Sequence, residues 1–107
     1  MILISKYITP KGFQGITLYP FVILRDSNLK SDRVLVNHER IHLKQQLELL
    51  VLPFYIWYVV EFLIRFIKHR DWHLAYRSIS FEREAYTNEK DLNYLELRSW
   101  FSFLKYL

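Results

Sequence analysis

The chain of 107 residues contains no cysteine, which excludes a disulfide framework and any metal site built on thiolates. Any metal ion must therefore be held by histidine, aspartate, glutamate or water. Glycine and proline are also scarce, at two and three residues, so few positions can break a helix and no glycine-rich phosphate loop can form. These shortages favour long helices and restrict metal binding to imidazole and oxygen ligands.

Charge of one sign is not concentrated anywhere in the sequence. Fifteen Lys and Arg residues exceed eleven Asp and Glu residues, for a net charge of +4, but no run of five basic residues occurs. We therefore expect no nucleic-acid partner, whereas the basic excess is compatible with an anionic membrane surface. The segment MILISKYITP lacks a basic region and a long apolar run. This predicts a cytoplasmic protein without a secretory signal, with contact at the inner face of the membrane as an open alternative.

The length suits one domain with one core, so residues 1–107 are expected to form a single minimal domain. Residues 2–7 and 16–24 are rich in aliphatic and aromatic side chains and are separated by turn-forming residues. They predict two strands that can form a hairpin. We further expect three or four helices after this hairpin, so the predicted fold class is α+β and predominantly helical.

The first predicted helix covers residues 33–51, where Ser31 or Asp32 can cap its start and Pro53 stops or kinks the chain. A second helical stretch covers residues 54–70 and continues to a break near residues 78–80. A third helix follows this break and begins with two glutamates in its first turn, where carboxylates suit the helix dipole. The aromatic C-terminal segment is expected to pack back on the protein or to meet a membrane.

The middle of the chain is unusually apolar. Residues 49–60 include no charge, and the apolar character continues to residue 67 around Glu61 and Arg65. A spanning helix needs about 20 mostly apolar residues, and shorter runs mark buried or interfacial helices. Glu61 and Arg65 are four residues apart and can pair on one helix face. Residues 49–67 therefore predict either a core helix or membrane contact.

A metal-binding pattern lies inside the first predicted helix. Residues 38–42 read His-Glu-Arg-Ile-His, the spacing H-E-x-x-H, in a chain with four histidines. Because residues four apart share a helix face, His38 and His42 can each direct one ring nitrogen at a common ion. Glu39 lies about 100° further round the helix, where it can act as a general base toward a nearby water. The alternative is an ordinary surface helix with solvated polar residues, so a third ligand is decisive.

The helix that begins with FEREAY supplies two candidates for the third ligand, Glu82 and Glu84. Residues two apart on a helix point about 200° apart, so only one of these carboxylates can face the histidine pair. Ala85 follows Glu82 by three residues, and its small side chain lets two helices approach closely. The residues alone leave Glu82 and Glu84 as rivals for the third ligand position.

The pattern His38-Glu39-x-x-His42, followed on a later helix by Glu82-x-x-Ala85, resembles the gluzincin zinc metallopeptidases. At this length the chain is similar to their smallest, minigluzincin-like members. The resemblance implies a zincin-like core, Zn²⁺ held by His38, His42 and Glu82, and Glu39 as the general base in hydrolysis of a peptide or protein substrate. The alternative is a non-catalytic metal-binding protein of the same fold, or a helical protein that acts at a membrane or with a partner.

The sequence departs from the family pattern at Tyr86, where many gluzincins have an aspartate that orients a ligand histidine. Tyr86 is a candidate for that supporting role or for stabilising an oxyanion. His73 and Tyr76 are further candidates for the oxyanion role. His69 and His73, four residues apart, are interpreted as exposed or hydrogen-bonded histidines rather than as a second metal site. The strand at residues 17–24 is either a core strand or the edge that binds a peptide.

Overall fold

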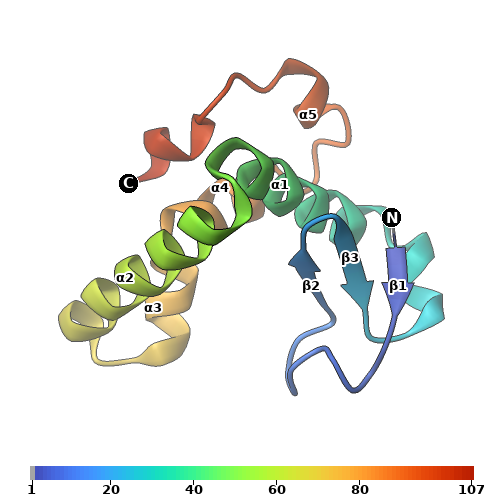
Figure 1. The fold of residues 1–107 in the computed structure, drawn as a ribbon, viewed down its shortest axis with the longest axis horizontal. Coiled ribbons are helices and arrows are strands. Elements are labelled where there is room, and N and C mark those ends of the chain that lie inside the picture. The colour runs from blue at the N-terminus through green and yellow to red at the C-terminus, as the bar shows by residue number, and fades with distance from the viewer. Residues whose placement is uncertain (1) are drawn as a thin grey trace.

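The computed structural model describes residues 2–107, and it is α+β and predominantly helical, as the sequence predicts (Figure 1). A small sheet lies beside the first long helix, and the next two helices extend away from the other end of that helix. The strands are β1 (Ile2–Ile4), β2 (Gly15–Leu18) and β3 (Phe21–Leu24). The α-helices are α1 (Arg33–Leu49), α2 (Val51–His69), α3 (Trp72–Ser78), α4 (Ser80–Asn88) and α5 (Tyr94–Leu97), and two 3₁₀ turns are η1 (Ser27–Ser31) and η2 (Ser102–Tyr106).

The sheet differs from the predicted hairpin. The predicted strand 16–24 is two strands, β2 and β3, which pair antiparallel across a two-residue loop, Tyr19-Pro20. β1 pairs with β3 in parallel, so the strand order is β1-β3-β2 and β3 is central. The prediction was wrong because Pro20 has no N–H to donate to a ladder and is therefore confined to the loop.

The first long helix ends earlier than predicted. Asp32 caps α1 by accepting a hydrogen bond from the backbone N–H of Leu35, which confirms one of the two predicted caps. α1 stops at Leu49, and Leu50 has a positive φ of 57°. Pro53 does not kink the helix but lies in the first turn of α2. Backbone N–H groups in the first turn of a helix have no acceptor within the helix, so the N–H that proline lacks is not needed there. The chain bends by 111° between α1 and α2.

The chain after the strands forms more helices than the three or four expected: residues 2–107 contain five α-helices. The break predicted near residues 78–80 is present at Ile79, which has an extended backbone between α3 and α4. Asp71 caps α3 by accepting from the N–H of Leu74. α3 runs back beside α2 and places α4 against α1 (Figure 1).

The core of the helical part is aromatic. Phe54, Phe81 and Phe103 are at most 2% exposed and pack together with the buried Ile79. Phe103 comes from η2, so the C-terminal segment packs back on the protein. This was one of the two alternatives predicted for that segment. Burial of one such aromatic side chain contributes about 2–3 kcal/mol.

Glu61 and Arg65 form the predicted pair on α2, with 3.4 Å between Arg65 Nη2 and Glu61 Oε2. The pair faces the interior, because Glu61 is 6% exposed and accepts hydrogen bonds from the backbone N–H and the hydroxyl of Ser80. Glu61 thereby fixes the start of α4 against α2. Among residues 2–107, no single helix is long and apolar enough to cross a membrane, and only α1 and α2 taken together, across their bend, have the required length and composition.

Candidate metal centre

The two histidines of the motif lie one turn apart on α1 and face the same side. Both are 6% exposed, and the distance between His38 Nε2 and His42 Nε2 is 3.2 Å. Two imidazole nitrogens that are this close and both buried have little access to water. The helical spacing therefore brings the rings together as the sequence predicts.

Glu82 of α4 completes a three-sided cluster with the histidines. Its Oε1 lies 3.0 Å from His42 Nε2 and 3.3 Å from His38 Nε2. The amide of Asn37 on α1 donates to the carbonyls of Glu89 and Asp91, at 2.8 Å and 2.9 Å, which holds the end of α4 against the motif helix. The neighbour of His38 on α1 thus fixes the helix that carries the carboxylate.

The dimensions of this cluster fit zinc. With zinc–ligand distances of about 2.0–2.2 Å, neighbouring ligand atoms around a tetrahedral ion lie about 3.3–3.6 Å apart. The three separations among His38 Nε2, His42 Nε2 and Glu82 Oε1 are 3.0–3.3 Å. A shift of about 0.3 Å brings all three atoms to ligand positions. His38, Glu39 and His42 also offer ligand atoms within 4.8 Å of one another, but among residues 2–107 the carboxylate that contacts both ring nitrogens is that of Glu82.

Gln45 sets the orientation of His42. His42 Nδ1 lies 2.8 Å from Gln45 Oε1, while Gln45 Nε2 donates to Glu84 Oε1 and to the carbonyl of Phe81. The Glu84 carboxylate and the Phe81 carbonyl can only accept hydrogen bonds, so the atom of Gln45 that faces them must be its amide nitrogen. The amide oxygen of Gln45 therefore faces His42 and accepts from Nδ1–H. That leaves Nε2 free to bind a metal ion, and in histidine metal sites the other ring nitrogen usually donates to a carboxylate or carbonyl in this way. Gln45 is three residues after His42, and this spacing on a helix was the signal available in the sequence.

Glu84, the rival of Glu82, faces away from the histidines. It is fully buried in an ion cluster with Arg98, whose guanidinium also lies 2.7 Å and 2.9 Å from the two oxygens of Glu48. Burial opposes ionisation, but Arg98, Tyr94 and Gln45 lower the pKa of the Glu84 carboxyl. Glu84 therefore links α4 to the C-terminal segment and reaches the candidate site only through Gln45.

Glu39 is buried at 4% exposure, and its Oε2 has no hydrogen-bond partner. Its backbone carbonyl accepts from the hydroxyl of Thr17, which fastens α1 to β2. Burial raises the pKa of the Glu39 carboxyl, although His42 and His38 act in the opposite direction. A buried carboxylate oxygen without a partner, beside two histidines, is available to exchange a proton with a bound molecule.

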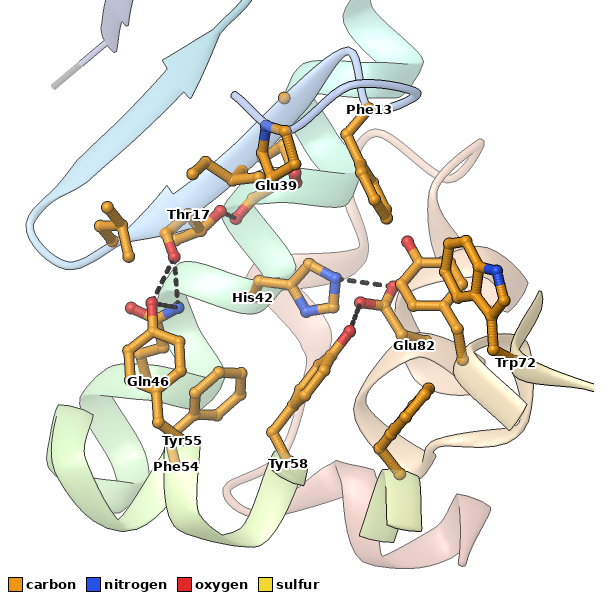
Figure 2. A pocket seen from close by; sticks show the side chains of 16 residues that line it. Phe13, Thr17, Glu39, His42, Gln46, Phe54, Tyr55, Tyr58, Trp72 and Glu82 are labelled. Atoms are coloured by element: carbon orange, nitrogen blue, oxygen red, sulfur yellow. Dashed lines mark hydrogen bonds and ion pairs between the residues drawn. The ribbon is translucent and has the colours of Figure 1, made fainter. Parts of the chain in front are cut away.

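Tyr58 is a site residue that sequence reasoning missed. Its hydroxyl donates to Glu82 Oε2 at 2.7 Å, which leaves Oε1 for the histidines (Figure 2). Burial and the neighbouring carboxylate raise the pKa of Tyr58, so its hydroxyl stays protonated and remains a donor. No sequence pattern links residue 58 to residue 82, because the contact depends on how α2 folds back after Leu50.

A cleft of about 370 Å³ opens on this cluster. Glu39, His42 and Glu82 form part of its lining, and Figure 2 shows Phe13 and Trp72 flanking the side on which His42 meets Glu82. The remaining walls are mostly apolar or aromatic and come from β2, α2 and α3: Ile16, Leu18, Phe54, Tyr55, Phe62 and Tyr76. An apolar cleft with a few convergent polar groups is the usual form of a ligand site.

The other predicted site residues lie in different places. Tyr86 packs against His38, with 4.5 Å between ring centroids, and its hydroxyl lies 3.1 Å from that of Tyr76, which lines the cleft. His73 is exposed on α3 and is not part of the cleft lining. His69 ends α2 and His73 lies on α3, and Arg70 between them has a positive φ of 55°. The two therefore do not share the helix face that their spacing suggested.

The strand predicted as a peptide-binding edge is split between two positions. β3 is central in the sheet, whereas β2 is the outer strand, and residues 15–18 line the cleft. The carbonyl of Thr17 already accepts from Gln46 at 2.8 Å and from Tyr55 at 2.7 Å. The edge beside the cleft is thus β2, with one of its carbonyls engaged by the protein itself.

A scan against protein-family models gives no match, and searches of the curated proteins and of the solved structures find none that is similar.

Proposed function

We propose that this protein binds Zn²⁺ through His38, His42 and Glu82 and hydrolyses peptide bonds. One observation carries the proposal: three buried ligand atoms from two helices converge to within 3.0–3.3 Å, beside a buried carboxylate oxygen of Glu39 that has no partner. An unpaired polar atom in a native interior indicates a missing ligand or a catalytic role. The resemblance to gluzincins in motif and order supports the same assignment.

Bound zinc supplies Lewis acidity, which polarises a carbonyl and makes water more acidic. Glu39 is the general base: its carboxylate takes one proton from the attacking water. As the peptide C–N bond breaks, the protonated Glu39 returns that proton to the leaving amine, so the carboxylate is regenerated. Gln45 holds the His42 ring through Nδ1, and Tyr58 holds Glu82 through Oε2. The hydroxyl of Tyr76, on the cleft wall, is the candidate donor to the developing oxyanion.

The cleft favours an extended peptide with apolar side chains. Its walls are predominantly apolar, and β2 provides an outer strand along one side. A peptide can add to such an edge through backbone hydrogen bonds, while its alternate side chains enter pockets. Ile16 and Leu18 of β2 line the cleft and would contact those side chains.

Zinc content measured by elemental analysis tests the metal site. About one zinc per chain is expected in the wild-type protein after dialysis, and a loss of zinc in His38→Ala and Glu82→Gln. Glu96→Gln, at an exposed position on α5, is the matched control and should keep zinc. Absence of zinc from the wild type after reconstitution, or retention in both ligand variants, would contradict the proposal.

A second candidate function is a non-catalytic zinc protein, which the engaged Thr17 carbonyl favours because it limits strand addition at β2. Glu39→Gln separates the two candidates. In a peptidase, this variant keeps zinc but loses hydrolysis of a fluorogenic peptide mixture by at least about a hundredfold. Zinc bound equally by both proteins, without hydrolysis by either, supports the non-catalytic candidate.

A further inference from the structure

The outward face of α2 is apolar along its length. Six aliphatic residues spaced as one helical stripe are 50–74% exposed: Ile56, Val59, Val60, Leu63, Ile64 and Ile67. α2 lies at the periphery of the molecule, with α3 beside it (Figure 1). Isolated exposed leucines are common in proteins, whereas a continuous exposed aliphatic stripe indicates a surface that binds another protein or a membrane.

α2 differs from an ordinary surface helix, because it is apolar on its outward face as well as on the side that packs Phe54 into the aromatic core. Its two mid-helix charges, Glu61 and Arg65, pair on the inward side, where Glu61 also anchors Ser80. A surface helix of a soluble domain turns its charges outward and its aliphatic residues inward. The inward polar contacts fix the rotation of α2, so the stripe cannot turn into the core.

We propose that the stripe on α2 binds the surface of an anionic lipid bilayer. The helix ends in basic residues, with Lys68 and Arg70 both exposed, and the chain carries a net charge of +4. Trp72 follows at 55% exposed, and tryptophan is enriched where a bilayer meets water. An aliphatic stripe beside basic residues matches an acyl layer beside anionic headgroups.

The chemistry of the stripe favours lipid over a protein partner. Protein interfaces form about one hydrogen bond per 100–200 Å², and their dominant contacts come from tryptophan, tyrosine and arginine. The six residues of the stripe are isoleucine, valine and leucine and carry no side-chain hydrogen-bonding group. Acyl chains require no such group, so contact with lipid leaves no polar atom unpaired.

The geometry favours a helix lying along the bilayer surface. α2 has 19 residues and is thus about 28 Å long, but its inward side packs against α3, bonds to α4 and holds the Glu61–Arg65 ion pair. An interfacial helix immerses only its apolar face, by about 5–10 Å. This position keeps the inward contacts of α2 intact.

Sedimentation of the full chain with lipid vesicles tests the inference. The wild type should sediment with phosphatidylcholine vesicles containing about 30% phosphatidylglycerol, and less with phosphatidylcholine alone. Val59→Gln/Leu63→Gln removes two residues of the stripe and should lower partitioning by about tenfold or more. Lys68→Gln/Arg70→Asn should lower binding to the anionic vesicles by about fivefold per charge removed.

The matched control is Leu92→Gln/Leu97→Gln, which makes the same chemical change at two exposed leucines elsewhere, and it should bind like the wild type. Circular dichroism of each variant establishes that it folds. A wild type that stays in the supernatant with every vesicle overturns the inference. So does a wild type that dimerises without lipid while Val59→Gln/Leu63→Gln is monomeric, because a second copy then covers the stripe.

Discussion

Replacing Tyr58 with phenylalanine is expected to weaken zinc binding without disturbing the cleft. The Tyr58 hydroxyl donates to Glu82 Oε2 at 2.7 Å, and this is the contact that positions Oε1 toward the two histidines. Phenylalanine keeps the ring and its packing against Phe54 and Phe81, with which Tyr58 is in aromatic contact. The change therefore removes a single hydrogen bond to a charged group.

The magnitude follows from that bond. A hydrogen bond to a charged group contributes about 1.5–3 kcal/mol, and groups that support metal ligands affect metal affinity by about 10–100-fold. Since 1.4 kcal/mol corresponds to about tenfold, the two figures agree, and the zinc dissociation constant of Tyr58→Phe should rise by about 10–100-fold. The number of zinc ions bound at saturation should stay the same.

Competition with a chromophoric zinc chelator measures this change. Tyr55→Phe is the control, because it removes a hydroxyl from the same helix and the same cleft. That hydroxyl bonds to Thr17 and Gln46, neither of which is a candidate metal ligand. Its zinc affinity should stay within about threefold of the wild type. Equal affinities of Tyr58→Phe and the wild type, or equal losses in both variants, would refute the argument that Tyr58 positions Glu82.

Three further predictions concern the buried charges. Arg98→Met leaves the buried carboxylates of Glu48 and Glu84 without their shared cation, so urea unfolding should show a loss of about 3–5 kcal/mol, whereas the exposed Arg83→Met should lose less than about 1 kcal/mol. In the metal-free protein, burial lowers the pKa of His42 but Glu82 more than offsets this and raises it from 6.5 to about 9. The protonated imidazole therefore stabilises the folded state fully below pH 6.5, and this contribution is lost as the pH rises through 9. Urea unfolding in a chelator should show that loss between these pH values, and His42→Gln should lack it. Because zinc must displace the same proton, its apparent affinity should rise by about tenfold per pH unit until the pH nears 9. An affinity that is constant across this range would contradict the assignment of His42 as a ligand.

The sequence was informative where local rules decide the outcome. Asp32 caps α1 because its side chain reaches an N–H three residues on, and the break near residue 79 follows from the serines around it. The same rules failed at Pro53, since the chain turned three residues earlier, at Leu50. They also failed at Pro20, where one predicted strand became a hairpin.

In the candidate site, too, some features follow from local spacing and others depend on contacts between distant residues. The spacing of His38 and His42 on one helix fixes their side-by-side placement, and the 200° separation of Glu82 and Glu84 means that only one can face them. Which glutamate does so depends on the rotation of α4, set by Asn37 and by the burial of Glu84 against Arg98. Those contacts join residues 14 to 54 positions apart, beyond the range of any local pattern.

By itself, the sequence determined an α+β, mainly helical chain with a histidine pair, an adjacent carboxylate and an apolar middle segment. Helical and strand periodicities are properties of neighbouring residues, so these features can be read without knowing the fold. Only the tertiary structure decided that Glu82 meets the histidines, that Tyr58 and Gln45 hold the cluster, and that the aliphatic face of α2 points outward. Each of these depends on how one helix is rotated against another, and that rotation is set by the packing of the whole core and by its buried polar contacts.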